Sequence, residues 1–231
     1  PYKVGVLGIF QSLNDAIKLI FKESMILNKF NYFIYYLSPL LNFLLVSMLF
    51  SLIPLVFNMD FFEYGVLFLF CCLSFNVYSV IMIGWSSNSK YSYLSSIRVI
   101  SQMISYEVSL MIFIICLISC LMSLSFLDFL KIQKMIWSFY FFIYIFFILL
   151  IIFLIEMNRI PFDFLEGESE LVSGFNIEYS SGFFAIIFIS EYMSIIFMSL
   201  LMKIIFFGGG LTNLLDFLIC LILLNFIILI R

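Results

Sequence analysis

Apolar runs of about 20 residues recur along the whole of this 231-residue chain, and they constrain its fold more than any other feature. A helix of that length crosses the hydrocarbon core of a bilayer, which is about 30 Å thick. Charged residues make up 11% of the sequence, against about 25% in soluble domains, so a soluble core could not absorb the apolar surface. Because backbone polar groups in lipid must be satisfied internally, the predicted fold is an all-α, polytopic transmembrane helix bundle.

Six spans are expected within a single membrane domain that covers residues 1–231. Residues 7–23 precede them and alternate polar and apolar positions at helical spacing, which predicts an N-terminal interfacial amphipathic helix. Pro1 and the stop at Arg231, directly after an apolar run, indicate a piece of a longer protein. The expected spans are 32–57, 63–84, 100–124, 135–157, 182–204 and 213–231.

Basic residues are unequally divided between the two sides that this helix order defines. The termini and the loops 85–99 and 158–181 hold 8 of the 11 Lys and Arg residues, and the opposite side holds 3. Because positive charge favours the side from which helices insert, the termini and these two loops are expected to face inward. The outward connections, around 58–62, 125–134 and 205–212, are expected to be short and without notable chemistry.

The charge balance and the cysteines exclude several classes of protein. A net charge of -3 with scattered basic residues argues against nucleic-acid binding. All 5 cysteines lie in apolar runs without CxxC spacing, and the chain contains no histidine. We therefore expect neither a metal site nor a disulfide framework.

Acidic residues are concentrated in one part of the chain. Arg159 is their only basic neighbour, and crowded carboxylates in a partly dry site repel one another, so they can take up and release protons. This pattern predicts a proton relay. The alternatives without a catalytic role are that the Glu156 side chain reaches the membrane interface and that Arg159 and Asp163 form a structural ion pair. Seven acidic residues lie between 156 and 191: Glu156, Asp163, Glu166, Glu168, Glu170, Glu178 and Glu191.

The carboxyl groups of Glu107 and Glu156 fall within or at the ends of predicted spans and that of Glu191 falls well inside one, where an ionisable group costs at least about 2.5 to 3.5 kcal/mol. We interpret them as functional; the alternative for Glu107 and Glu191 is a satisfied polar contact between helices. Pro161 is expected to end the span that contains Glu156, because the residue before a proline disfavours the helical region. The following acidic segment would then be irregular and would border a cavity.

Three polar strings carry a resemblance to a known family: EMNRIPFDFLEGESELVSGFNIEYSSG at 156–182, GWSSNSKYSYLSSIRVISQMISYEVSL at 84–110, and QSLNDAIKLIFKE at 11–23. In their order along the chain, these strings resemble the chain 1 family. Its members are the quinone-site membrane subunit of mitochondrial NADH:ubiquinone oxidoreductase, the respiratory complex I. That family has eight transmembrane helices, so the resemblance implies that this chain is its second to seventh helix and lacks both ends.

The resemblance implies a ubiquinone tunnel and the start of a proton path that couples quinone reduction to proton translocation. Ubiquinone would be the substrate, and no metal, flavin or iron-sulfur cluster would be bound by this chain. The implied location is the mitochondrial inner membrane, with peripheral-arm quinone-site subunits and antiporter-like membrane subunits as partners. Asp15, Arg159, Asp163, Glu166, Glu168 and Glu170 would border the quinone cavity, and Glu107, Glu156, Glu178 and Glu191 would begin the proton path.

Two other functions compete with this interpretation. The related membrane subunit of an energy-converting hydrogenase is disfavoured by the closely matched GESELVSGFN tract. A freestanding secondary transporter of protons or other ions would also carry intramembrane carboxylates, but it would ordinarily show internal repeats, and none is evident in this sequence.

Overall fold

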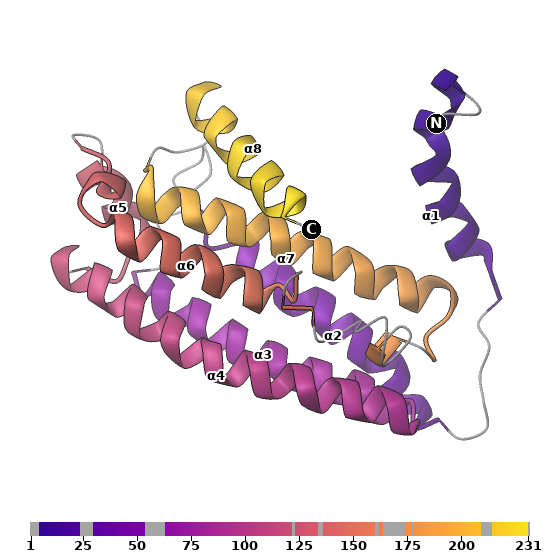
Figure 1. Ribbon diagram of the computed structural model, residues 1–231. Coiled ribbons are helices and arrows are strands. Elements are labelled where there is room, and N and C mark those ends of the chain that lie inside the picture. Colours follow the sequence, from indigo (N-terminus) through magenta and orange to yellow (C-terminus); the bar gives the residue numbers. More distant parts are fainter. Residues whose placement is uncertain are drawn as a thin grey trace.

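The computed structural model describes residues 5–23, 30–53, 63–121, 123–133, 136–159, 162–163, 174–176, 178–208 and 214–230. Within these ranges all regular structure is helical and no strand occurs, which confirms the predicted all-α class. Figure 1 shows an elongated bundle in which the long helices lie side by side.

The long helices have the length and composition of membrane spans, which confirms the predicted polytopic bundle. They are α2 (Tyr32–Phe50), α3 (Gly65–Ser86), α4 (Lys90–Leu121) and α7 (Ser181–Phe206). Two shorter apolar helices, α6 (Ile143–Glu156) and α8 (Leu214–Leu229), complete the apolar set. Helix α2 packs between α3 and α7, α4 packs on α3 and α6, and α8 lies on α7 (Figure 1).

Two backbone hydrogen bonds fix the direction of the helices. Asn31 N donates to Ser86 O at 3.1 Å, which joins the start of α2 to the end of α3. Val66 N donates to Leu124 O at 3.2 Å, which joins the start of α3 to the segment after α4. The bundle therefore has two ends. We call the end at Asn31 and Ser86 the inner end and the end at Val66 and Leu124 the outer end, after the sides that the distribution of basic residues predicts.

Helix α4 begins at Lys90 and not near residue 100, so the expected loop 85–99 is reduced to a turn at 87–89. The cause is a close approach of α3 and α4 at Gly84. Ser92 Oγ donates to Gly84 O at 3.1 Å, and a Cβ on Gly84 would lie 2.4 Å from Ser96 Oγ. Small hydroxyl residues are thus buried along the helix contact. At about 48 Å for 32 residues, α4 is longer than a bilayer core is thick.

The connection between α4 and α6 at the outer end contains more helical structure than the short loop that was expected. Residues 126–133 form a helix, α5 (Phe126–Gln133), where a loop was expected, and Ser138–Tyr140 form a short 3-10 helix, η2. Helix α6 then begins at Ile143, eight residues after the start of the expected span at 135.

Side chains from this outer segment cap the end of α7. Gln133 Nε2 and Ser138 Oγ donate to Ile205 O at 2.5 and 2.6 Å, which satisfies a carbonyl that has no partner within its own helix. Gly208 follows with a φ of +59°, a conformation that favours glycine, and its Cα lies against the Gln133 side chain. Two separate segments therefore fix the outer end of the bundle.

The N-terminal segment consists of a 3-10 helix, η1 (Gly5–Phe10), and α1 (Gln11–Phe21). Leu13, Ile17 and Ile20 are exposed and recur at helical spacing on α1, as the predicted amphipathic pattern requires. Helix α1 contacts α7, but these three side chains stay exposed. Its position at the membrane interface stays a prediction.

Candidate functional site

Helix α6 ends at Glu156 through a backbone turn at Asn158, whose φ is +50°. Asn158 N donates to Ile155 O at 3.0 Å, and Arg159 N donates to Leu154 O at 3.1 Å. This pair of bonds is the Schellman pattern of helix ends, in which a left-handed residue reverses the chain. The turn places Glu156 in the last helical position and directs the chain sideways at Arg159.

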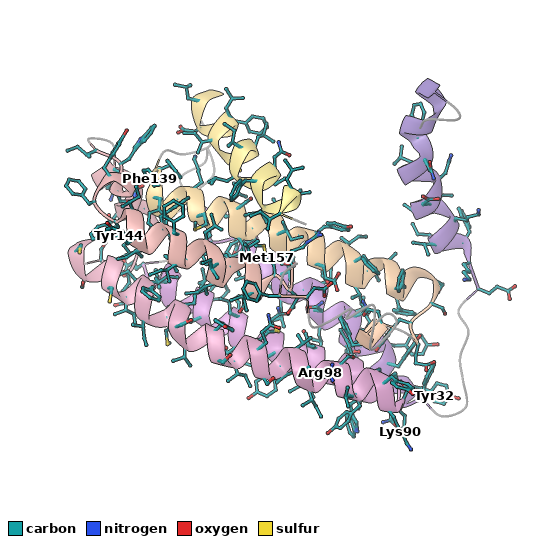
Figure 2. The ribbon with its side chains drawn as sticks, viewed as in Figure 1. Tyr32, Lys90, Arg98, Phe139, Tyr144 and Met157 are labelled. Carbon is teal, nitrogen blue, oxygen red and sulfur yellow. The ribbon has the colours of Figure 1, made fainter. Side chains whose placement is uncertain are left out.

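The helix ends well inside the bundle. In Figure 2, Met157 lies midway along the bundle, far from Lys90 at the inner end and from Tyr144 at the outer end. The same depth follows from α4, because Gln102, which contacts Ile155, lies about 18 Å along the helix from its start. The chemistry at the end of α6 is therefore surrounded by other helices.

Glu156 and Glu107 form the central pair of the site. The Glu156 side chain is 6% exposed, and no hydrogen bond to its Oε2 atom is found among the described residues. Glu107 is half-buried on α4 and interacts electrostatically with Glu156. Two carboxyl groups that sense each other's charge titrate as a coupled pair, so together they can hold and release a proton.

Gln102 ties α4 to the end of α6 and to the chain beyond it. Its Nε2 donates to Ile155 O at 3.2 Å and to Phe162 O at 3.1 Å. The sequence analysis did not single out this residue. The available signal was an amide inside a predicted apolar span, five residues before Glu107.

Arg159 connects the end of α6 to α7. Its guanidinium carbon lies 5.7 Å from the centre of the Tyr192 ring, a distance at which a cation and an aromatic face attract. Tyr192 follows Glu191, which is half-buried on α7, and Asp163 is half-buried four residues after Arg159. The structure thus brings Glu107 of α4 to Glu156 at the end of α6, and it brings Arg159, beyond that end, to Tyr192, the residue after Glu191 on α7.

A hydroxyl cluster at the inner end holds the segment that contains Glu178. Tyr35 OH donates to Glu178 O at 3.2 Å, and Tyr179 OH bonds Ser38 Oγ at 3.1 Å and Ser86 Oγ at 2.8 Å. Burial raises the pKa of Tyr179, so its hydroxyl keeps its proton at neutral pH. Glu178 itself is half-buried.

A second polar group crosses the same helices deeper in the bundle. Asn42 Nδ2 donates to Ser190 Oγ at 2.8 Å, and Ser79 Oγ donates to Asn42 Oδ1 at 3.1 Å. These bonds join α2, α3 and α7 directly beside Glu191. Buried hydrogen bonds of this kind hold membrane helices in a fixed register.

Four predicted site residues remain, and Asp15 is the one that the structure describes. Asp15 is exposed on α1, and no contact to Arg159 or Asp163 is found among the described residues. Glu166, Glu168 and Glu170 lie outside the described residues. Within the described ranges, no group of three or more His, Cys, Asp or Glu side chains could hold a metal ion.

The fold and the site define a polytopic helical membrane protein with carboxyl groups inside its helix bundle. Residues 1–231 match the family model described as NADH dehydrogenase, and the chain belongs to that family. The resemblance predicted from the three polar strings is therefore confirmed.

Several curated proteins named NADH-ubiquinone oxidoreductase chain 1 are similar to the chain. That of Locusta migratoria is 48% identical over 189 residues, which cover 82% of this chain and 60% of the relative. That of Anopheles gambiae is 44% identical over the same lengths and shares. That of Chondrus crispus is 42% identical over 213 residues, covering 91% of this chain and 65% of the relative. The chain thus spans less than two thirds of these relatives.

Proposed function

We propose that this chain is part of the core membrane subunit of a proton-pumping NADH:ubiquinone oxidoreductase in the mitochondrial inner membrane. The observation that carries the proposal is the pair formed by the buried Glu156, at the end of α6, and the half-buried Glu107 on α4. Ionisable groups are costly inside a membrane, so those that occur there are usually functional. The names of the similar proteins indicate which function that is.

The quinone side of the site is assigned to the segment after α6. Arg159 supplies a cation beside Tyr192, and a cation can stabilise the negative charge that develops as a quinone is reduced. Asp163 lies half-buried in the same segment. We assign Asp15, Glu166, Glu168 and Glu170 to the border of the same cavity on the basis of the family resemblance. No metal, flavin or iron-sulfur cluster is assigned to this chain.

The proton side is assigned to four carboxyl groups. Conversion of ubiquinone to ubiquinol takes up two electrons and two protons, and the electrons reach the quinone from a neighbouring subunit. A negative intermediate near Arg159 would change the proton occupancy of the Glu107 and Glu156 pair, because buried charges interact strongly. Glu178 at the inner end and Glu191 on α7 complete this set. Coupling to pumping begins here.

The proposed partners are the peripheral-arm subunits that deliver electrons and the antiporter-like membrane subunits that carry protons onward. The test is purification of the native membrane assembly, with mass spectrometry of its subunits and assay of NADH oxidation by ubiquinone. We expect this chain to migrate with a large assembly that reduces ubiquinone. Isolation as a lone chain would favour a transporter, and isolation with hydrogenase subunits would favour the related family.

A residue-level test uses Glu156→Gln in a host whose equivalent subunit can be engineered. Glutamine keeps the size and hydrogen-bonding capacity but cannot titrate, so quinone reduction and pumping should both fall while assembly is retained. Glu63→Gln is the matched control, because Glu63 is exposed. Unchanged pumping in Glu156→Gln would contradict the proton role.

A further inference from the structure

We propose that Tyr179 is a positioning residue that holds Glu178 in place for proton transfer, acting together with Tyr35. The inference deepens the proposed function and rests on it, because it concerns how one member of the carboxyl set is fixed. It follows from a stack of rings and three hydrogen bonds at the inner end of α2, α3 and α7.

The segment that carries Glu178 has little regular structure of its own. Ser180 is extended, and Ser181 has a φ of +57°, which is uncommon for a residue other than glycine. Within the described part of this segment, the Tyr179 backbone N donates to Asn176 O at 3.1 Å. The position of Glu178 therefore depends on side chains that reach it from other helices.

Tyr179 supplies two of these attachments. Its hydroxyl bonds Ser38 of α2 and Ser86 of α3, so one side chain ties the segment to two helices. Both serine side chains are fully buried. Loss of the Tyr179 hydroxyl would remove one hydrogen bond from each serine Oγ, and loss of a hydrogen bond to a buried polar atom costs free energy.

Tyr35 supplies the third attachment. Its ring stacks on Tyr179 with centroids 4.4 Å apart and planes 5° apart, and on its other face against Phe30 at 4.9 Å. From this sandwich its hydroxyl donates to the backbone oxygen of Glu178. The ring stack orients the Tyr35 hydroxyl, and this hydroxyl holds the backbone of Glu178. The two tyrosines therefore position Glu178 together.

The experiment compares Tyr179→Phe and Tyr35→Phe with Tyr36→Phe in the assembled complex. Each variant removes one hydroxyl and keeps the ring; Tyr36 contacts Tyr35 and Phe183 through its ring and serves as the control. We expect Tyr35→Phe, which loses one buried hydrogen bond, to lower quinone reduction and pumping by about 2- to 10-fold, and Tyr179→Phe, which loses two, to lower them by at least as much. Tyr36→Phe and the rate with an artificial electron acceptor should be unchanged.

A double-mutant cycle separates positioning from packing. If Tyr179 acts through Glu178, Tyr179→Phe should lower the rate in the native background but have no further effect in a Glu178→Gln background. Multiplying effects of the two substitutions would overturn the proposal. So would failure of both tyrosine variants to assemble, since the role would then lie in folding.

The same cycle distinguishes the two levels of the hypothesis. An impaired Glu178→Gln variant with fully active tyrosine variants would overturn the positioning role alone. A fully active Glu178→Gln variant would remove Glu178 from the proton path, and the positioning role with it. Neither result depends on the subunit composition that tests the broader function.

Discussion

The guanidinium carbon of Arg159 lies 5.7 Å from the centre of the Tyr192 ring, so the broken end of α6 meets α7 one residue after Glu191. This contact links the segment assigned to the quinone with a helix assigned to the protons. A displacement of Arg159 would change its contact with Tyr192, the neighbour of Glu191 on α7.

Arg159→Ala should lower ubiquinone reduction by at least about threefold, because a cation-π contact is worth about 0.5 to 2 kcal/mol and the substitution also removes the local cation. Arg159→Lys should retain part of the activity. NADH oxidation by an artificial acceptor should be unaffected, as should both rates in Arg98→Ala, which alters an exposed position on α4. A parallel loss of both rates at equal complex abundance would contradict the cavity role.

Glu107→Gln should assemble normally but lose quinone reduction and pumping, since the carboxyl that interacts with Glu156 could no longer titrate. Glu107→Asp should keep partial activity, because it still titrates with a shorter reach. Both rates are measured per assembled complex, with the exposed Glu63→Gln as control. Full pumping in Glu107→Gln would show that the residue is only a contact between helices.

Gly84→Ala should destabilise the α3 and α4 hairpin, because the added Cβ would lie 2.4 Å from Ser96 Oγ and 3.1 Å from Ser92 O. Overpacking of this kind typically costs about 1 to 3 kcal/mol, which should appear as reduced abundance of the complex. Gly182→Ala is a matched control, since its Cβ would meet nothing within 4 Å. Adding Ser96→Gly to Gly84→Ala should restore part of the abundance; no restoration would contradict the assigned contact.

Ser125 caps the start of α5, because Asp128 N donates to Ser125 Oγ at 3.4 Å and Ser125 Oγ donates to Asp128 Oδ2 at 2.6 Å. This cap should be sensitive to acid. Hydrogen bonds from Ser125 and Lys131 hold the pKa of Asp128 below its ordinary value of 3.8. A carboxyl with a lowered folded pKa stabilises the helix above the ordinary value, and that stability is lost as the pH falls through the folded pKa. Hydrogen exchange of α5, corrected for the intrinsic rate, should thus show more opening below pH 3.8.

The same cap can be tested by mutation at neutral pH. Ser125→Ala should increase local opening of α5 by about 0.5 to 2 kcal/mol, the usual worth of a helix N-cap. Thr in place of Ser125 should largely preserve protection. Equal exchange in the native and Ala proteins would remove Ser125 from the cap.

Tags near Asn88 and Ser125 should lie on opposite sides of the membrane, with Asn88 on the matrix side. Asn88 belongs to the turn between α3 and α4 at the inner end, and Ser125 follows Leu124 at the outer end. The side is assigned from the distribution of basic residues. Protease protection in oriented vesicles would contradict the assignment if both tags were cut from the same side.

The sequence was sufficient to predict the helical bundle, because apolar runs long enough to span a membrane leave few other folds. It was not sufficient for the ends of two helices. Residues 90–99 are rich in Ser, Tyr and charge and so suggested a loop, whereas their small side chains pack against Gly84. The end of α6 was assigned to Pro161, which lies outside the described residues; the described cause is the left-handed turn at Asn158.

The candidate site was predicted in part. Glu107 and Glu156 could be predicted as site residues because their carboxyl groups lie in apolar runs, where an isolated charge is energetically costly. The contacts that organise them could not be predicted. Gln102, Tyr35 and Tyr179 resemble ordinary interface or packing residues in the sequence, and their partners lie 53 to 143 positions away in the chain.

The early end of α6 also bears on membrane voltage. With 14 residues, the helix is about 21 Å long, shorter than the roughly 30 Å hydrocarbon core. An electric potential falls mainly across the part of a barrier that excludes water and mobile ions. If water reaches Glu156 from the inner side, the voltage is concentrated over this shortened path. A proton leaving Glu156 outward would then cross most of the field, at about 2.3 kcal/mol per 100 mV.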